Sequence, residues 1–158
     1  MPNILLIGNG AREHAMAEAI TRSGEKSRLF SFMKSNNPGI ASLSEKTMQG
    51  GYADLNSIKQ FAADNQIEFA VIGPEDPLGN GVVDALAKIN IPSVGPTQSL
   101  ARLETSKSFT RNLVSKYQIP GNPKFKVFKD MSGVDAFLHE IEGIVLKPDG
   151  LTGGKGVL

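Results

Sequence analysis

The sequence predicts an α/β protein built on an open parallel sheet. Through residues 1–103, short apolar runs of strand length alternate with stretches in which apolar residues recur at helical spacing. Segments rich in glycine, proline and asparagine follow the apolar runs at residues 8–10, 36–39, 73–78 and 95–97. In a parallel sheet the carboxyl ends of the strands face one edge, where ligands bind. These segments are therefore expected to form one site.

The first strand and helix enclose a glycine turn. Residues 4–7 are consecutive apolar residues, which suits a strand buried on both faces. Gly8, Asn9 and Gly10 follow, and alanines then recur at helical spacing until Gly24. Such a turn lets the backbone approach an anion closely, and the unpaired amides and dipole of the helix favour negative charge there. The turn predicts a phosphate site.

The next elements continue the alternation. Strands are predicted at residues 29–33, 69–72 and 93–94. Asp54 is placed to cap a helix that ends near Asn65, another helix is expected around residues 82–89, and Thr97 is placed to cap the helix after it. Residues 35–39 and 73–78 are interpreted as loops.

The pattern changes near residue 104, so we predict a first domain over residues 1–103 and a second over 104–158. A helix is expected from Ser106 to Tyr117, with strands at 124–128 and 144–147. Ser132 and Asp135 resemble a capping box for a helix over 136–138. The chain stops where a further strand is expected, which predicts that the second domain is incomplete.

The glycine turn has two functional interpretations and a structural one. Gly8 and Gly10 match the first glycines of a dinucleotide-binding fold, as in an NAD-dependent dehydrogenase, but Glu13 stands at the third position. The second strand also runs into Lys34 and lacks the acid that would hold the NAD ribose. A phosphate monoester fits better, and a purely structural turn stays open. His14 is expected to pack or hydrogen-bond locally.

Residues 73–78 carry two acidic side chains on a proline-fixed loop at the same predicted edge. A carboxylate there can accept hydrogen bonds from both hydroxyls of a ribose, and Glu75 is our candidate. A phosphate turn and a ribose acceptor on one edge together predict a sugar phosphate. The alternative for the acidic loop alone is a solvated turn.

The last residues form a glycine-rich stretch. Lys155 is followed by Gly156, where a Walker phosphate loop has serine or threonine, and no helix follows. We interpret residues 148–158 as a mobile flap that folds its amides over a nucleotide triphosphate, with charge from Lys107 and Lys147. For Lys147 the alternative is a lysine that extends to solvent from a buried strand.

Composition limits the function classes. The 158 residues include no cysteine, which excludes disulfides, thiolate catalysis and cysteine-ligated metals. A net charge of +1 gives no reason to expect nucleic acid or an anionic membrane as a partner. The sequence shows neither a signal-peptide pattern nor an apolar stretch of membrane-spanning length, which predicts a cytoplasmic protein.

Four motifs together resemble the glycinamide ribonucleotide synthetase family, also called phosphoribosylamine glycine ligases, of the ATP-grasp superfamily. They are Gly-Asn-Gly-Ala-Arg-Glu-His-Ala at 8–15, Gly-Pro-Glu-Asp-Pro-Leu at 73–78, Gly-Pro-Thr at 95–97 with Glu-Thr-Ser-Lys at 104–107, and Lys-Pro-Asp-Gly at 147–150 continuing to Gly156. Asn-Pro-Gly-Ile at 37–40 is similar to archaeal members.

The resemblance implies a Rossmann-like substrate domain followed by the beginning of an ATP-grasp domain. It implies that the whole protein joins glycine to 5-phosphoribosylamine in de novo purine biosynthesis, with ATP and Mg²⁺ or Mn²⁺, and forms ADP and phosphate. The implied substrate residues are Gly8, Asn9, Gly10, Arg12, Glu13, Pro38, Gly39, Gly73, Pro74 and Glu75. The implied ATP residues are Lys107, Lys147, Gly150, Gly153, Gly154, Lys155 and Gly156.

The resemblance assigns no catalytic or metal-binding residue to this chain, because those of the family lie beyond Leu158. The 158 residues alone are therefore expected to be inactive. Sister ATP-grasp enzymes share the first-domain plan, so another substrate of that superfamily is an alternative. The expected partners are small molecules only, and the oligomeric state stays open.

Overall fold

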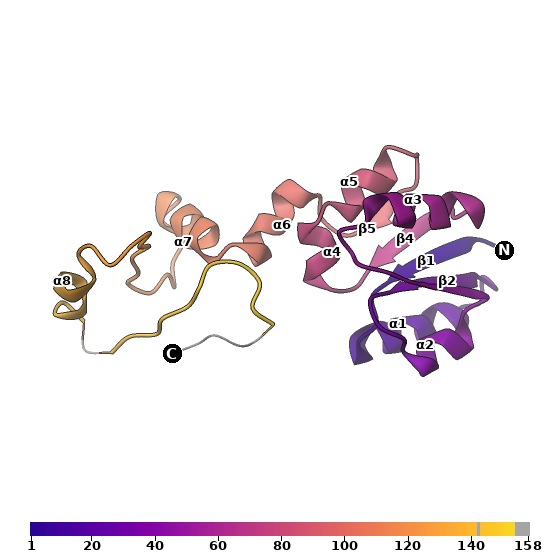
Figure 1. Ribbon diagram of the computed structural model, residues 1–158, viewed down its shortest axis with the longest axis horizontal. Coiled ribbons are helices and arrows are strands. Elements are labelled where there is room, and N and C mark those ends of the chain that lie inside the picture. Colours follow the sequence, from indigo (N-terminus) through magenta and orange to yellow (C-terminus); the bar gives the residue numbers. More distant parts are fainter. Residues whose placement is uncertain (142, 154–158) are drawn as a thin grey trace. The chain divides into compact units, whose positions relative to one another are not determined.

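The computed structural model describes residues 1–141 and 143–153 (Figure 1). The chain forms two compact units, Met1–Ala101 and Arg102–Leu158. Helix α6 (Gln98–Thr105) contains the point of division. The part of the chain described here contains no helix that is both long enough and apolar enough to cross a membrane.

The first unit is an α/β layer structure around a parallel sheet, as predicted. Its strands lie in the order β3-β2-β1-β4-β5, and every neighbouring pair is parallel. The strands are β1 (Asn3–Ile7), β2 (Arg28–Met33), β3 (Lys46–Gln49), β4 (Phe69–Ile72) and β5 (Ser93–Val94).

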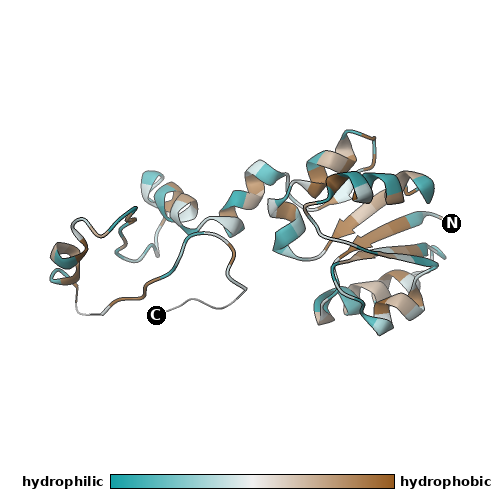
Figure 2. Cartoon of the chain, in the orientation of Figure 1, coloured by the Kyte–Doolittle hydropathy of each residue, from teal (hydrophilic) through white to brown (hydrophobic). Residues whose placement is uncertain are grey.

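Helices cover both faces of this sheet. Figure 1 shows α1 (Ala11–Thr21) and α2 (Pro38–Leu43) on one face and α3 (Leu55–Asp64) and α5 (Val82–Ala87) on the other. Leu6 packs into the cluster on the α1 side, whereas Leu5 and Ile7 belong to the cluster on the α3 side. Burying each such side chain contributes about 1.5–3 kcal/mol, and Figure 2 shows the hydrophobic colour concentrated on the strands.

The predicted strands of the first unit are confirmed, and Asp54 caps α3 by accepting a 3.0 Å hydrogen bond from the Ser57 amide. The weak strand β3 was not predicted. It is a four-residue edge strand whose residues are mostly exposed, so it has no apolar run.

Both predicted loops turn out to contain the start of a short helix, so interpreting them as loops throughout is wrong. Asn37 caps α2 by accepting hydrogen bonds from the amides of Gly39 and Ile40, and Pro38 is its first residue. Helix α4 (Glu75–Gly79) contains Pro77 in its first turn, where the missing amide hydrogen has no intrahelical partner to lose.

The second unit contains α7 (Lys107–Lys116) and α8 (Val134–Leu138). Ser106 caps α7 as expected, with its hydroxyl 3.2 Å from the Phe109 amide. The strands predicted at 124–128 and 144–147 are not formed, and Val127 and Val145 are 48% and 63% exposed. A strand requires a partner for its backbone groups, and these segments pair with no other described residue.

The predicted capping box before α8 is also wrong. The residue before α8 is Gly133, in the left-handed conformation with φ of 73°. The amide of Ser132 instead donates a 2.8 Å hydrogen bond to Asp130 Oδ1. Asp130 therefore stabilises the turn that leads into the helix.

Candidate functional site

Three segments that follow strands meet at the carboxyl edge of the sheet, and we call them the edge segments: residues 8–12, 34–37 and 73–76. The Asn37 side chain donates to the carbonyl oxygen of Asn9 at 3.0 Å, which joins the first two. Arg12 Nη2 lies 3.5 Å from Glu75 Oε1, and Lys34 Nζ lies 3.5 Å from Asp76 Oδ2. These two ion pairs connect the first and second edge segments to the third. These contacts link three of the four segments that were predicted to gather. In the fourth, residues 95–97, Gly95 lies beside the side chain of Leu78.

Glu13 is a buried carboxylate at the centre of the edge segments. It is 3% exposed, accepts a 2.8 Å hydrogen bond from the Gly10 amide, and lies 3.0 Å from Arg12 Nε. A Cβ atom added to Gly8 or to Gly73 would overlap the Glu13 side chain. Glu13 therefore occupies the space that glycine leaves in both segments. Its hydrogen bond from the Gly10 amide is the one half of a capping box that α1 can form, because glycine has no side chain for the other half.

The backbone amides of the site glycines donate hydrogen bonds to acceptors within the fold. The Gly8 amide donates to Phe32 O, the Gly73 amide donates to Ile7 O, and the Gly39 amide donates to Asn37 Oδ1, at 3.0–3.1 Å. Gly8, Gly10 and Gly39 belong to the segments that were predicted to lie near a phosphate, whereas Gly73 belongs to the predicted ribose loop. Charged side chains are also exposed at this edge.

Those exposed side chains alternate in charge. Arg12 and Lys34 are 53% and 62% exposed, and their partners Glu75 and Asp76 are 41% and 48% exposed. The pKa of Arg12 is raised, chiefly by its hydrogen bond to Glu13 and then by the charges of Glu13 and Glu75. Exposed pairs of this kind contribute only about 0–1 kcal/mol, so a ligand can replace them at small cost. The arrangement offers cations for a phosphate and carboxylates for hydroxyl or amine groups.

Tyr52 was missed by the sequence reasoning. Its hydroxyl donates to Asn9 Oδ1 at 2.7 Å and accepts from the Lys34 amide at 3.3 Å. Burial raises the pKa of Tyr52, which keeps the phenol protonated. The residue lies before α3, in no recognisable motif, so no local signal marks it.

His14 packs locally, as expected. Its imidazole lies against Gly39, where any Cβ atom would overlap the ring, and its Nε2 is 3.8 Å from Glu18 Oε1. Glycine at position 39 therefore permits the close approach of α1 and α2. Pro38 begins α2, and Pro74 precedes α4.

In the second unit the predicted ATP residues are partly brought together. Lys107 Nζ donates to the carbonyl oxygen of Gly150 at 2.6 Å. Asp149 accepts hydrogen bonds from the side chains of Ser108 and Ser106 and from the amides of Ser108 and Gly150, which lowers its pKa to about 2. Lys147 is exposed and Gly153 has φ of 59°, while Gly154, Lys155 and Gly156 lie outside the described residues.

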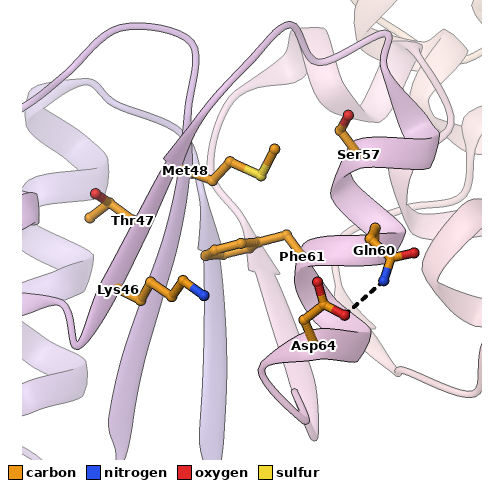
Figure 3. A pocket seen from close by; sticks show the side chains of 7 residues that line it. All are labelled: Lys46, Thr47, Met48, Ser57, Gln60, Phe61 and Asp64. Atoms are coloured by element: carbon orange, nitrogen blue, oxygen red, sulfur yellow. Dashed lines mark hydrogen bonds between the residues drawn. The ribbon is translucent and has the colours of Figure 1, made fainter.

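A separate cavity of about 260 Å³ lies between β3 and α3 (Figure 3). It is lined by Lys46, Thr47, Met48, Ser57, Gln60, Phe61 and Asp64, and Gln60 donates to Asp64 across one side at 2.7 Å. None of these residues was predicted as a site residue. Within residues 1–141 and 143–153, no group of three His, Asp or Glu side chains is arranged to hold a metal ion.

Two family models match adjacent parts of the chain. The model described as phosphoribosylglycinamide synthetase, N domain, matches residues 2–104, and its ATP-grasp (A) domain matches residues 105–158. The chain belongs to the phosphoribosylglycinamide synthetase family. The resemblance inferred from the four motifs is thereby confirmed.

Curated relatives agree with the family models. The phosphoribosylamine–glycine ligases of Methanopyrus kandleri and Methanocaldococcus jannaschii are 45% and 48% identical to this chain. The two matches cover 99% and 98% of this chain. That of Methanobrevibacter smithii is 48% identical over 98%. These archaeal relatives are longer, and the chain spans 35–36% of their length.

Solved structures show the same fold. An N5-carboxyaminoimidazole ribonucleotide synthetase in complex with ADP superposes with a TM-score of 0.79 at 19% identity, over 99% of this chain and 41% of that one. A phosphoribosylglycinamide synthetase from Anaerococcus prevotii gives a TM-score of 0.66 at 14% identity, over 91% of this chain and 36% of that one. The α/β fold class expected from the sequence is confirmed, and the match of the ATP-grasp (A) domain model to residues 105–158 agrees with the expected start of that domain.

Proposed function

We propose that this chain is the phosphoribosylamine-binding part of an ATP-dependent ligase that makes glycinamide ribonucleotide in purine biosynthesis. The observation that carries the proposal is the meeting of Arg12, Asn9 and Glu75 at one sheet edge of a phosphoribosylglycinamide synthetase family member. A cation and an amide suit a phosphate, while a carboxylate suits ribose hydroxyls.

In the proposed reaction of the whole protein, a glycine carboxylate oxygen attacks the γ-phosphorus of ATP and ADP leaves. The amine of phosphoribosylamine then attacks the carbonyl carbon of the acyl phosphate, loses a proton, and releases inorganic phosphate. A divalent ion, Mg²⁺ or Mn²⁺, would neutralise the phosphate charge. We propose that the 158 residues alone release no ADP from ATP.

The substrate residues proposed for this chain are those of the edge segments and the start of α2. Glu75 accepts from the ribose, and the phosphate lies near Asn9, Gly10, Pro38 and Gly39. Arg12 supplies a cation for the phosphate, and Gly8, Glu13, Gly73 and Pro74 shape this edge. The ATP phosphates are proposed to lie near Lys107, Lys147 and the glycines at 150, 153, 154 and 156, with Lys155. The proposed domain boundary lies between residues 103 and 104.

An NAD-binding dehydrogenase domain is less well supported. The buried Glu13 stands at the third position of the dinucleotide fingerprint, where close packing of the helix on the strand needs glycine or alanine, and β2 is followed by Lys34. Isothermal calorimetry of the 158-residue chain with ribose 5-phosphate and with NAD tests this choice. We expect heat from ribose 5-phosphate, and much less with Arg12→Ala than with the control Arg22→Ala. Binding of NAD without binding of ribose 5-phosphate would contradict the proposal.

A further inference from the structure

Tyr52 contacts two of the three edge segments although it belongs to no motif of the family resemblance. We propose that Tyr52 is a positioning residue that turns the side-chain amide of Asn9 so that its NH₂ group faces the phosphoribosyl ligand. The inference rests on the proposed function and adds a residue to its site. It is carried by the direction of the hydrogen bonds between Lys34, Tyr52 and Asn9.

The direction of these hydrogen bonds is determined by their donors. The backbone amide of Lys34 can only donate, so the Tyr52 oxygen accepts from it at 3.3 Å. The phenol has a single proton, which is then directed to the Asn9 side chain 2.7 Å away. The Asn9 atom that receives it must be an acceptor. Oδ1 therefore faces Tyr52, and Nδ2 faces away from it.

The Tyr52 ring is held in place by packing. The residue is 5% exposed, and its ring centroid lies 6.5 Å from that of Phe32 at an interplanar angle of 46°. The backbone of Asn9 is held separately, because its carbonyl oxygen accepts from Asn37 Nδ2 at 3.0 Å. With both ends of the residue fixed, the Asn9 side chain has one favoured orientation.

The oriented amide suits an oxygen-rich ligand. Asn9 Nδ2 makes no hydrogen bond to any described residue, and Asn9 is partly exposed at the sheet edge. Its two hydrogens can donate to phosphate or ribose oxygens, whereas the flipped amide would present its carbonyl oxygen to them and repel them. Without the Tyr52 hydroxyl, both orientations become accessible and part of the binding is lost.

The test is a double-mutant cycle in the 158-residue chain, with ribose 5-phosphate as the probe in calorimetry. We expect Tyr52→Phe to weaken binding about three- to tenfold, the loss of one hydrogen bond. In an Asn9→Ala background, Tyr52→Phe should change nothing further. Asn9→Asp keeps the acceptor for Tyr52 but has no NH₂, so it should weaken binding while leaving the unfolding temperature unchanged. Tyr117→Phe, at a 62% exposed tyrosine, is the control.

The outcomes separate the two proposals. If the unsubstituted chain does not bind ribose 5-phosphate, the proposed function and this inference are both overturned. If the unsubstituted chain binds ribose 5-phosphate and the Tyr52→Phe chain binds it equally well, only the inference is overturned. The same holds if Tyr52→Phe weakens binding in the Asn9→Ala background as much as it does in the unsubstituted chain. A readout without substitution is the nitrogen resonance of Asn9 Nδ2, which should shift when ribose 5-phosphate is added. An unchanged resonance in a chain that binds the probe also overturns the inference.

Discussion

The carboxylate of Glu13 accepts a 2.8 Å hydrogen bond from the backbone amide of Gly10 while being almost completely buried. The same side chain fills the space beside Gly8 and Gly73, in which a Cβ atom does not fit. The glycines after β1 and β4 are thus required by a carboxylate between them. A motif that reads as a phosphate turn is also a packing arrangement around one acid.

Replacing Glu13 by alanine should destabilise the first unit by about 1–3 kcal/mol, because the Gly10 amide at the start of α1 loses its acceptor. Glu13→Gln keeps an acceptor and should cost less. Glu18→Ala, at an exposed position of the same helix, is the matched control. Urea unfolding followed by circular dichroism measures the free energy. Equal midpoints for the Glu13→Ala and Glu18→Ala chains would contradict this role for Glu13.

Gly73→Ala should destabilise the chain by about 1–3 kcal/mol, since the new Cβ overlaps a buried side chain that has little room to move. The double variant Gly73→Ala with Glu13→Ala should lose less than the sum of the two single losses, because truncating Glu13 removes the overlap. Gly51→Ala, where a Cβ meets nothing within 4 Å, is the control. Strict additivity of the two losses in thermal unfolding would rule out the packing explanation.

Glu75→Ala should weaken ribose 5-phosphate binding by roughly 1.5–3 kcal/mol, the loss of a charged acceptor. The fold should persist, because Glu75 is 41% exposed and its pair with Arg12 is a long 3.5 Å. Calorimetry gives the affinity, and the exposed Glu25→Ala serves as the control. An unchanged dissociation constant in a folded chain would remove Glu75 from the site.

The contact between Asp149 and the start of α7 should weaken in acid. Hydrogen bonds from Ser108 and Ser106 favour the charged carboxylate and lower its pKa from 3.8 to about 2. A carboxylate whose pKa is lowered by folding stabilises the folded state at pH values above its pKa in the unfolded chain. This stabilisation is lost as the pH falls through the pKa of the group in the folded state. The loss is thus expected between about pH 4 and pH 2.

Amide exchange at Ser108 should therefore accelerate over that pH range, after correction for the intrinsic rate. In Asp149→Asn the protection should be low at every pH, whereas Asp135→Asn should behave like the unsubstituted chain. Protection of Ser108 that does not depend on pH would show that Asp149 does not hold this segment.

The sequence by itself determined the features that depend on neighbouring residues. The apolar run of β1, the glycine turn after it and the cap at Asp54 are local patterns, and each formed as predicted. Parallel topology then required the edge segments to meet, because all strands of such a sheet end at one edge. The family followed from motifs spread over both units.

The tertiary structure alone decided which groups at that edge are exposed. The edge strand β3 forms because β2 offers it backbone partners, and its own residues carry no apolar pattern. The predicted strand at 144–147 did not form without such a partner. Tyr52 reaches Asn9 across 43 positions of sequence, and Arg12 reaches Glu75 across 63. Contacts of this kind depend on the path of the whole chain, and no periodicity of the residues beside them encodes that path.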